Sequence, residues 1–337
     1  MDSRQQQLNA WLNLTLKQAD FTLTTASADA SFRRYFRVHL PGEYLGYKTL
    51  IAMDAPPSQE DCRPFVKVAK LLSDAGLNAP QVLAQDLQNG FLLLSDLGDD
   101  TYLAALNSDT ALKLYGDATN ALIKMQLASK PQVLPAYDEA LLSREMQLFP
   151  DWYVAKHVNV TLNNEQQNVL KNTFDILNKN ILAQGQVYVH RDYHSRNLMI
   201  TQENNPGILD FQDAVYGAIS YDLVSLLKDA YISWDEEQII DWAVRYWQPA
   251  KKAGLPIADD FSEFYRDFEW MGAQRHIKIL GIFARLNHRD GKDGYLKDMP
   301  LVMTYLRKVC ERYVELRPML RLLNQLEHVK PQEGYTF

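Results

Sequence analysis

The chain has 337 residues, of which 47% are hydrophobic and 11% aromatic, and this composition predicts a globular protein with a sizeable core. The length predicts two lobes or one large domain. The formal net charge is −7, from 35 Lys and Arg against 42 Asp and Glu. Nucleic acid is therefore not an expected partner, because binding its phosphates requires a clustered positive surface.

The two cysteines and the start of the chain indicate a compartment. Cys62 and Cys310 lie far apart and form no metal-ligand spacing, a pattern typical of a reducing cytoplasm. The N-terminal segment lacks the apolar core of a signal peptide, and no run approaches the roughly 18 apolar residues that span a bilayer. We therefore expect a cytoplasmic protein with no membrane partner. We also expect a monomer.

The first elements read as a helix, a loop and a strand. Residues 4–19 carry apolar side chains at helical spacing. A run of small residues at 24–31 precedes the strand pattern of 35–38. Small side chains at such a turn let backbone N–H groups approach an anion, so Ser31 is a candidate nucleotide contact. The run lacks glycine, and an ordinary loop is the alternative.

The strand pattern at 49–54 lies where a protein kinase carries a lysine for the α- and β-phosphates of the nucleotide. This sequence has Met53 and Asp54 there instead. Lys48 precedes the strand, and Arg33, Arg34 and Arg37 lie in the segment before it. One of these could supply the missing positive charge, and Arg34 and Lys48 are the leading candidates. Simple surface exposure is the alternative for both.

A helical pattern at 59–75 leads to two further strands, the second of which ends near residue 94. The pattern breaks abruptly at Ser95, Asp96 and Leu97. We interpret this break as a hinge where an adenine could bond to main-chain groups.

From about residue 100 the chain is helical apart from one segment. Apolar residues recur at intervals of three and four in the stretches 110–128, 137–149, 164–184, 220–232, 236–249, 258–286 and 298–325. The predicted fold class is α+β, with a small antiparallel-sheet lobe at 1–95 that binds nucleotide and a large helical lobe at 96–337 that carries the catalytic and substrate-binding residues.

The exceptional segment is a predicted hairpin with polar residues at its ends. One short apolar run begins after Asn197, and a second ends at Asp210, with an Asn/Pro/Gly turn between them. Antiparallel pairing would make Asn197 and Asp210 neighbours, as oxygen ligands for Mg²⁺. Asp192 lies five residues before Asn197 and could orient a substrate hydroxyl and accept its proton. The alternative is an ordinary hairpin whose acids face solvent.

The same positions match the catalytic loop of protein kinases. His190-Arg191-Asp192 is followed by four residues and Asn197, as in H-R-D-x-x-x-x-N, and Asp210-Phe211-Gln212 takes the place of D-F-G. About ten residues separate Asp210 from the next predicted helix, which leaves no room for a peptide-binding platform. A small-molecule substrate is therefore expected.

Together with DFQDA at 210–214, Gly217 and YDL at 221–223, the catalytic segment resembles the aminoglycoside phosphotransferase and choline kinase superfamily. The resemblance implies a protein-kinase-like bilobal fold, ATP as co-substrate and Mg²⁺. It also implies that Asp192 is the catalytic base and that Asn197 and Asp210 bind the metal. Asp222, with His190, would support the catalytic loop.

A narrower resemblance comes from SFRRYFR at 31–37, MDAPP at 53–57, GAQRH at 272–276 and ILGIFARL at 279–286. These segments look like the bacterial anomeric sugar kinases of cell-wall (peptidoglycan) recycling, which phosphorylate the 1-hydroxyl of N-acetylmuramate and N-acetylglucosamine with ATP. The implied partner is a small amino sugar. N-acetylmuramate carries a carboxylate, so Arg275 is a candidate ligand. His194 and His276 are further candidates, with a structural histidine as the alternative for each.

Two other functions remain open from the sequence. A kinase of the same fold could act on another hydroxyl, such as that of an aminoglycoside, choline or another metabolite. A non-catalytic nucleotide-binding module is the second alternative, although such a module has no chemical need for Asp192, Asn197 and Asp210 together.

Overall fold

The computed structural model describes residues 3–17, 20–28 and 32–327. The chain divides into two compact units. The first unit consists of Met1–Thr110 and Arg196–Ala214, and the second of Ala111–Ser195 and Val215–Phe337. Ser31, a predicted nucleotide contact, lies outside the described residues.

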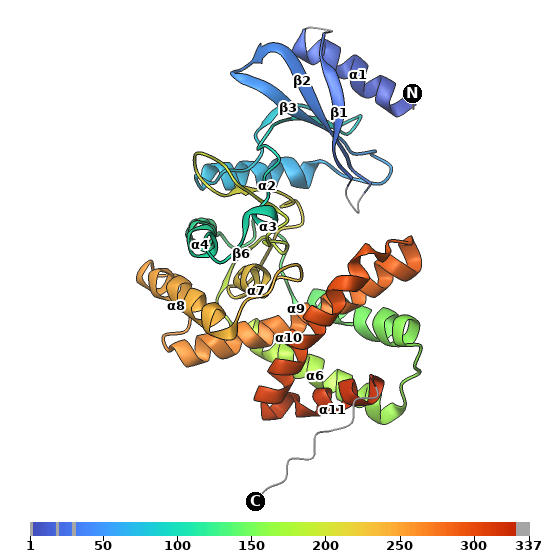
Figure 1. The fold of residues 1–337 in the computed structure, drawn as a ribbon, viewed down its shortest axis with the longest axis vertical. Helices are drawn as coiled ribbons and strands as arrows, with labels where there is room; N and C mark the ends of the chain where they lie inside the picture. The colour runs from blue at the N-terminus through green and yellow to red at the C-terminus, as the bar shows by residue number, and fades with distance from the viewer. Residues whose placement is uncertain (1–2, 18–19, 29–31, 328–337) are drawn as a thin grey trace, which may run out of the picture. The chain divides into compact units, whose positions relative to one another are not determined.

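The described strands of the first unit form a five-stranded antiparallel sheet in the order β1-β2-β3-β5-β4. Their bounds are β1 Thr22–Ala28, β2 Arg34–Tyr44, β3 Tyr47–Asp54, β4 Val82–Asp86 and β5 Phe91–Ser95. Helix α1, Ser3–Leu16, lies against this sheet (Figure 1). Its buried Leu8 and Leu12 belong to the same core cluster as Val38 and Leu50 of the sheet. Burial of these apolar side chains holds the helix in place.

Helix α2, Arg63–Asp74, short helix α3, Tyr102–Ala105, and the hairpin of β7, Leu198–Met199, and β8, Gly207–Ile208, complete the first unit. The backbone N–H of Ile200 donates to Asp100 O over 2.7 Å, and that of Ile208 donates to Asn78 O over 2.7 Å. These bonds tie the hairpin to the first unit. For this reason the units differ from the predicted lobes at 1–95 and 96–337.

The second unit is mainly helical. Its α-helices are α4 Ala111–Leu127, α5 Glu139–Met146, α6 Asn164–Ala183, α7 Tyr221–Leu227, α8 Glu236–Lys252, α9 Phe261–Asp290, α10 Met299–Arg312 and α11 Arg317–Leu326. A π-helical segment, Phe149–Val158, follows α5, and strands β6, Gln186–Val189, and β9, Val215–Ala218, pair antiparallel. The 30-residue α9 contacts α6, α7 and α10 and forms the centre of this unit (Figure 1).

Two predicted helices differ from the observed ones. The stretch 298–325 is broken after Arg312, because Pro318 in the first turn of α11 has no N–H to continue a helix and its ring would clash with the preceding turn. The stretch 220–232 ends as a helix at Leu227. There the Asp229 carboxylate accepts the N–H of Tyr231 over 3.1 Å and directs the backbone out of the helix.

Helix α9 lies very close to the segment between α5 and the π-helix. A Cβ on Gly281 would lie 2.4 Å from the carbonyl carbon of Leu148, whereas a Cβ on Gly272 would meet nothing closer than 3.6 Å. The lack of a side chain at Gly281 therefore allows the approach. None of the helices in the described ranges combines the length and the apolar character needed to cross a bilayer.

Candidate active site

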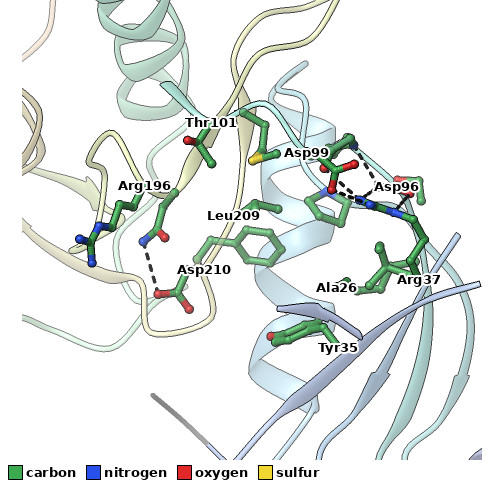
Figure 2. Close-up of a pocket in the computed structure, with 18 of the residues that line it drawn as sticks. Ala26, Tyr35, Arg37, Asp96, Asp99, Thr101, Arg196, Leu209 and Asp210 are labelled. Atoms are coloured by element: carbon green, nitrogen blue, oxygen red, sulfur yellow. Dashed lines mark hydrogen bonds and ion pairs between the residues drawn. The ribbon is translucent and has the colours of Figure 1, made fainter. Parts of the chain in front are cut away.

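The first unit contains a pocket of about 320 Å³ beneath the sheet. Three predicted nucleotide contacts, Ser95, Asp96 and Leu97, line it. The predicted metal ligands Asn197 and Asp210 line the same pocket (Figure 2). Residues that are about a hundred positions apart in the sequence thus meet because the β7–β8 hairpin packs against the chain that leaves β5.

We call the end of this pocket at Ser95, Asp96 and Leu97 its hinge end. It carries Arg37, which the sequence offered as one of several possible cations but not as a leading candidate. Arg37 on β2 donates from Nε to Asp96 over 2.6 Å, from Nη1 to Asp99 over 2.5 Å, and from Nη2 to Gly98 O over 3.2 Å. The bond to Asp96 raises the pKa of Arg37 above its usual value. Strand alternation could have indicated that Arg37 faces the pocket. Arg37 lies two residues after Tyr35 on the same strand and is the register partner of Ile51, and all three residues line the pocket.

The two cations predicted for this pocket are not among its lining residues. Arg34 donates from Nε over 3.0 Å to Asp54, which is buried and also accepts from Arg4 over 2.7 Å. Lys48 is exposed. Each lies an odd number of positions from a lining residue of its own strand, so its side chain points to the opposite face of the sheet.

The other end of the pocket holds the predicted metal ligands. Asn197 Nδ2 lies 3.4 Å from Asp210 Oδ2, and the N–H of Leu209 donates to the carbonyl of Asn197 over 2.9 Å. Gln212 donates to Asp210 Oδ1 over 2.9 Å. Asp210 has a φ of +62°, a left-handed conformation that is costly for a residue with a side chain. The hairpin therefore fixes Asp210 next to Asn197, as the sequence predicted.

This pair fits a hard divalent cation. The Asp210 side chain is 34% exposed, so water and phosphate oxygens could reach it, and rotation of the Asn197 amide would add a second oxygen. Mg²⁺ is typically held by one or two carboxylates with waters and substrate phosphates, without a closed protein cage. Elsewhere too, the described part of the chain contains no group of three or more His, Cys, Asp and Glu that could hold a metal ion.

The predicted catalytic loop belongs to the second unit and begins where β6 ends. The N–H of His190 donates to Asp222 Oδ2 over 2.6 Å, and the N–H of Arg191 donates to Asp222 Oδ1 over 3.0 Å. The N–H of Asp192 then donates to the ring of His190 over 3.2 Å. Asp222 and His190 thus hold the backbone of the loop, although Arg191 adopts a φ of +79°.

A second buried acid holds the far end of the loop. Asp229, which follows α7, accepts the N–H of Ser195 over 3.0 Å and also bonds the Ser195 hydroxyl. No sequence pattern selects Asp229. It is one of many acids in the chain, and only the fold brings it to Ser195.

Asp192 remains partly accessible, with its side chain 41% exposed. Loss of hydration on its protein-facing side raises its pKa, but the positive charges of Lys278 and Arg275 outweigh this effect and bring the pKa to about 2. Arg275 Nη1 lies 4.0 Å from the carboxylate. For Asp222 the balance is reversed, because burial outweighs its two backbone N–H bonds and raises the pKa to about 7.

Behind the loop lies a buried ion network that the sequence patterns did not reveal. Glu145 on α5 accepts from Lys278 over 3.0 Å and also pairs with Arg191 and the Tyr137 hydroxyl. Burial raises the pKa of Glu145, but these three partners, Lys278 first, bring it below its usual value. Tyr221 links the network further, because its hydroxyl accepts from Lys278 over 3.0 Å.

The predicted substrate residues occupy different environments. Arg275 is buried and donates to Arg191 O over 2.7 Å and to the Tyr221 hydroxyl over 3.1 Å, which places it at the loop. The ring of His194 contacts that of Tyr231 edge-on at 5.3 Å.

His276 lies in the core of the second unit. It is buried and stacks on Tyr305 at 5.1 Å, and burial lowers its pKa to about 3. Its surroundings are those of a structural histidine, which was the alternative that the sequence left open.

Comparisons with known proteins agree with this geometry. The chain is 50% identical over 335 residues to an N-acetylmuramate/N-acetylglucosamine kinase of Pseudomonas aeruginosa, which covers 96% of this chain and 97% of the relative. It is 48% identical over 339 residues to a protein of the same name from Neisseria meningitidis, with 99% of both chains covered.

Solved structures share the fold at low identity. The choline kinase LicA of Streptococcus pneumoniae has a TM-score of 0.65 at 10% identity and covers 90% of this chain and 99% of its own. The ADP-bound aminoglycoside phosphotransferase APH(2'')-Ib has a TM-score of 0.60 at 12% identity, and the match covers 92% of this chain and 99% of that structure. The predicted α+β, protein-kinase-like fold is confirmed.

A model of the phosphotransferase enzyme family matches residues 22–256. This span includes the pocket of the first unit and the loop around Asp192. The predicted resemblance and the assignment to a kinase are therefore confirmed, and the chain belongs to the phosphotransferase enzyme family.

Proposed function

We propose that the protein transfers the γ-phosphoryl group of ATP to the anomeric 1-hydroxyl of N-acetylmuramate and N-acetylglucosamine. The observation that carries this proposal is the near-full-length similarity, at 50%, 48% and 45% identity, to three proteins named N-acetylmuramate/N-acetylglucosamine kinase. The product, a sugar 1-phosphate, fits a role in peptidoglycan recycling. We also propose a cytoplasmic location, where ATP is available to such a kinase.

Asp192 is the proposed residue that orients the sugar hydroxyl and accepts its proton. A pKa of about 2 keeps the carboxylate ionised at neutral pH, so that it can accept a hydrogen bond from the hydroxyl. Such a low pKa makes it a weak base. That suffices for phosphoryl transfer through a loose transition state, where positioning and charge stabilisation supply most of the catalysis.

Asn197 and Asp210 are the residues that would hold Mg²⁺. When bound, the metal would neutralise charge on the phosphate oxygens. The adenine is assigned to the hinge end of the pocket, at Ser95, Asp96 and Leu97. Support comes from their position in the same pocket as Asn197 and Asp210.

His190 and Asp222 are positioning residues for the loop that carries Asp192. Both oxygens of Asp222 accept backbone N–H groups at the start of this loop, which supports this role. Arg275 lies 4.0 Å from Asp192, and a fixed positive charge there favours a neutral or anionic acceptor. An aminoglycoside, which is polycationic, would be repelled by it.

The proposal is tested by phosphorus NMR of the products formed from Mg·ATP and either sugar, with Asp192→Asn as the matched variant. We expect an anomeric sugar phosphate with the unmutated protein and none with Asp192→Asn. Binding of ATP without phosphorylation of either sugar would reject the substrate. Equal turnover by Asp192→Asn would reject the role of Asp192.

A further inference from the structure

The pocket of the first unit requires a positive charge for the nucleotide phosphates, and strand β3 does not supply it. Ile51 of β3 lines the pocket, and the next residue on the same face of the strand is Met53. A methionine carries no charge. We therefore compared the cations on the other elements of the first unit.

Several other cations of the first unit are paired with, or directed toward, groups other than Asp210. Arg34 and Arg4 both pair with the buried carboxylate of Asp54. Arg37 is bonded to Asp96 and Asp99 at the hinge end, which Figure 2 shows well separated from Asp210. Arg196 lines the pocket, but in Figure 2 its guanidinium extends away from Asp210.

Like Arg34 and Lys48, Arg33 is not among the residues that line the pocket, but it differs from them in lying next to the lining residue Asp210. Its Nη2 lies 3.9 Å from Asp210 Oδ1, and its side chain is only 10% exposed. Arg33 directly precedes β2 and belongs to the connection from β1. Its charge is thus held at the metal-ligand end of the pocket, next to the carboxylate that would share a metal with the phosphates.

We propose that Arg33 is the phosphate-binding cation of this pocket and takes the role that a third-strand lysine has in protein kinases. The inference rests on the proposed use of ATP. A guanidinium presents a fork of donors that can bind two phosphate oxygens at once. In this role the Arg33 guanidinium donates hydrogen bonds to the phosphate oxygens from its position 3.9 Å from Asp210 Oδ1.

The test compares nucleotides that differ only in their phosphates. Titration calorimetry measures the affinity for ATP, ADP and adenosine of the unmutated protein, Arg33→Met and Arg33→Lys. We expect Arg33→Met to weaken ATP binding by about 10- to 100-fold, the range for hydrogen bonds to charged groups. Adenosine affinity should stay unchanged, and Arg33→Lys should recover part of the ATP affinity.

Arg63→Met is the matched control, since Arg63 is an exposed arginine of the same unit that pairs with Asp61. It should leave all three affinities unchanged. Arg196→Met and Lys48→Met test two other cations. The proposal is overturned if Arg33→Met leaves ATP affinity unchanged, if it weakens adenosine equally, or if Arg196→Met or Lys48→Met alone causes the selective loss.

A second readout separates phosphate binding from damage to the metal end. Without nucleotide, Mn²⁺ binding followed by electron paramagnetic resonance should be as tight or tighter in Arg33→Met, because a positive charge near Asp210 is removed. The Asp210→Asn variant should no longer bind Mn²⁺. Weaker Mn²⁺ binding in Arg33→Met would mean that Arg33 organises the ligands, and would overturn the proposed role.

These results can be distinguished from failure of the proposed function. Selective loss of ATP affinity in Arg33→Met without sugar phosphorylation by the unmutated protein supports Arg33 and rejects the sugar. Unchanged ATP affinity in Arg33→Met, with sugar 1-phosphate formed by the unmutated protein, rejects Arg33 and keeps the kinase. If the unmutated protein binds no ATP, both proposals fall.

Discussion

The Lys278 ammonium lies 3.0 Å from Glu145 Oε1 within the second unit, and both side chains are almost fully buried. Glu145 also pairs with Arg191, the residue before Asp192. Removing one partner of a buried ion pair leaves a charge without compensation, which typically costs about 3–5 kcal/mol. The pair therefore couples the stability of the second unit to the charge around the proposed base.

Replacing Lys278 by Met should raise the pKa of Asp192, because Lys278 is the foremost of the positive charges that lower it. Asp192 acts in its ionised form, so the acid limb of the pH profile of kcat/KM should move to higher pH. The Lys278→Arg variant keeps the positive charge, so the acid limb of its pH profile should stay where it is in the unmutated protein. A lower rate with an unmoved acid limb would show that Lys278 acts only on stability.

Asp222 should make the stability of the protein depend on pH. Its folded pKa of about 7 lies above the unmodified value of 3.8, so between these values the folded state binds more protons than the unfolded state. Its contribution to stability is therefore fully present below the unfolded pKa and is lost as the pH rises through about 7. Asp222→Asn removes this pH dependence.

Urea unfolding of the unmutated protein and of Asp222→Asn at pH 5 and pH 7.5 measures the effect. The stability difference in favour of the unmutated protein should be larger at pH 5. A difference that is equal at both pH values would contradict the raised pKa. Asp222→Asn should also lower kcat, because one of the two loop N–H bonds loses its carboxylate acceptor.

Asp210→Ala should abolish the part of ATP binding that depends on Mg²⁺. Asp210 supplies the carboxylate next to Asn197, and the remaining amide is a weak ligand alone. Calorimetry with Mg²⁺ and with a chelator should give equal ATP affinities for the variant and different ones for the unmutated protein. Adenosine binding serves as the control for folding, and persistent metal dependence would exclude Asp210 as a ligand.

Two glycines of α9 should respond in opposite directions to the same substitution. Gly281→Ala places a Cβ about 2.4 Å from backbone atoms of Leu148, so we expect a loss of at least about 2 kcal/mol from overpacking. Gly272→Ala meets only ordinary contacts and should gain about 0.5–1 kcal/mol from helix propensity. Urea unfolding checks both, and similar values for the two variants would refute the proposed close approach.

The sequence predicted those features that local patterns encode. Apolar periodicity located α1, α6 and α9, and the fixed spacing of Asp192, Asn197 and Asp210 identified a kinase-type segment. The hairpin that joins Asn197 to Asp210 followed from strand and turn signals alone. These inferences depend on residues close together in the chain or in a recurring order.

Long-range pairings left no such signal. Arg33, Arg34 and Arg37 are nearly adjacent in sequence, but alternation and strand register send Arg34 to Asp54 and Arg37 to Asp96. Glu145 is one of several polar residues of α5, and its ion-pair partners come from the catalytic loop and α9. Arg34 was a reasonable candidate for the pocket because it is a cation near the expected position. Only the strand register of the folded chain shows that its side chain bonds Asp54 instead.

The two acids that anchor the loop around Asp192 lie at opposite ends of the short helix α7. Asp222 is in its first turn, and Asp229 follows its last residue, Leu227, by two positions. Inserting one residue into an α-helix rotates everything beyond it by about 100° and shifts it by about 1.5 Å. Such an insertion would move Asp229 relative to Asp222, so that the two carboxylates could no longer bind both ends of the loop. The length of α7 therefore has to be kept in any redesign of this protein.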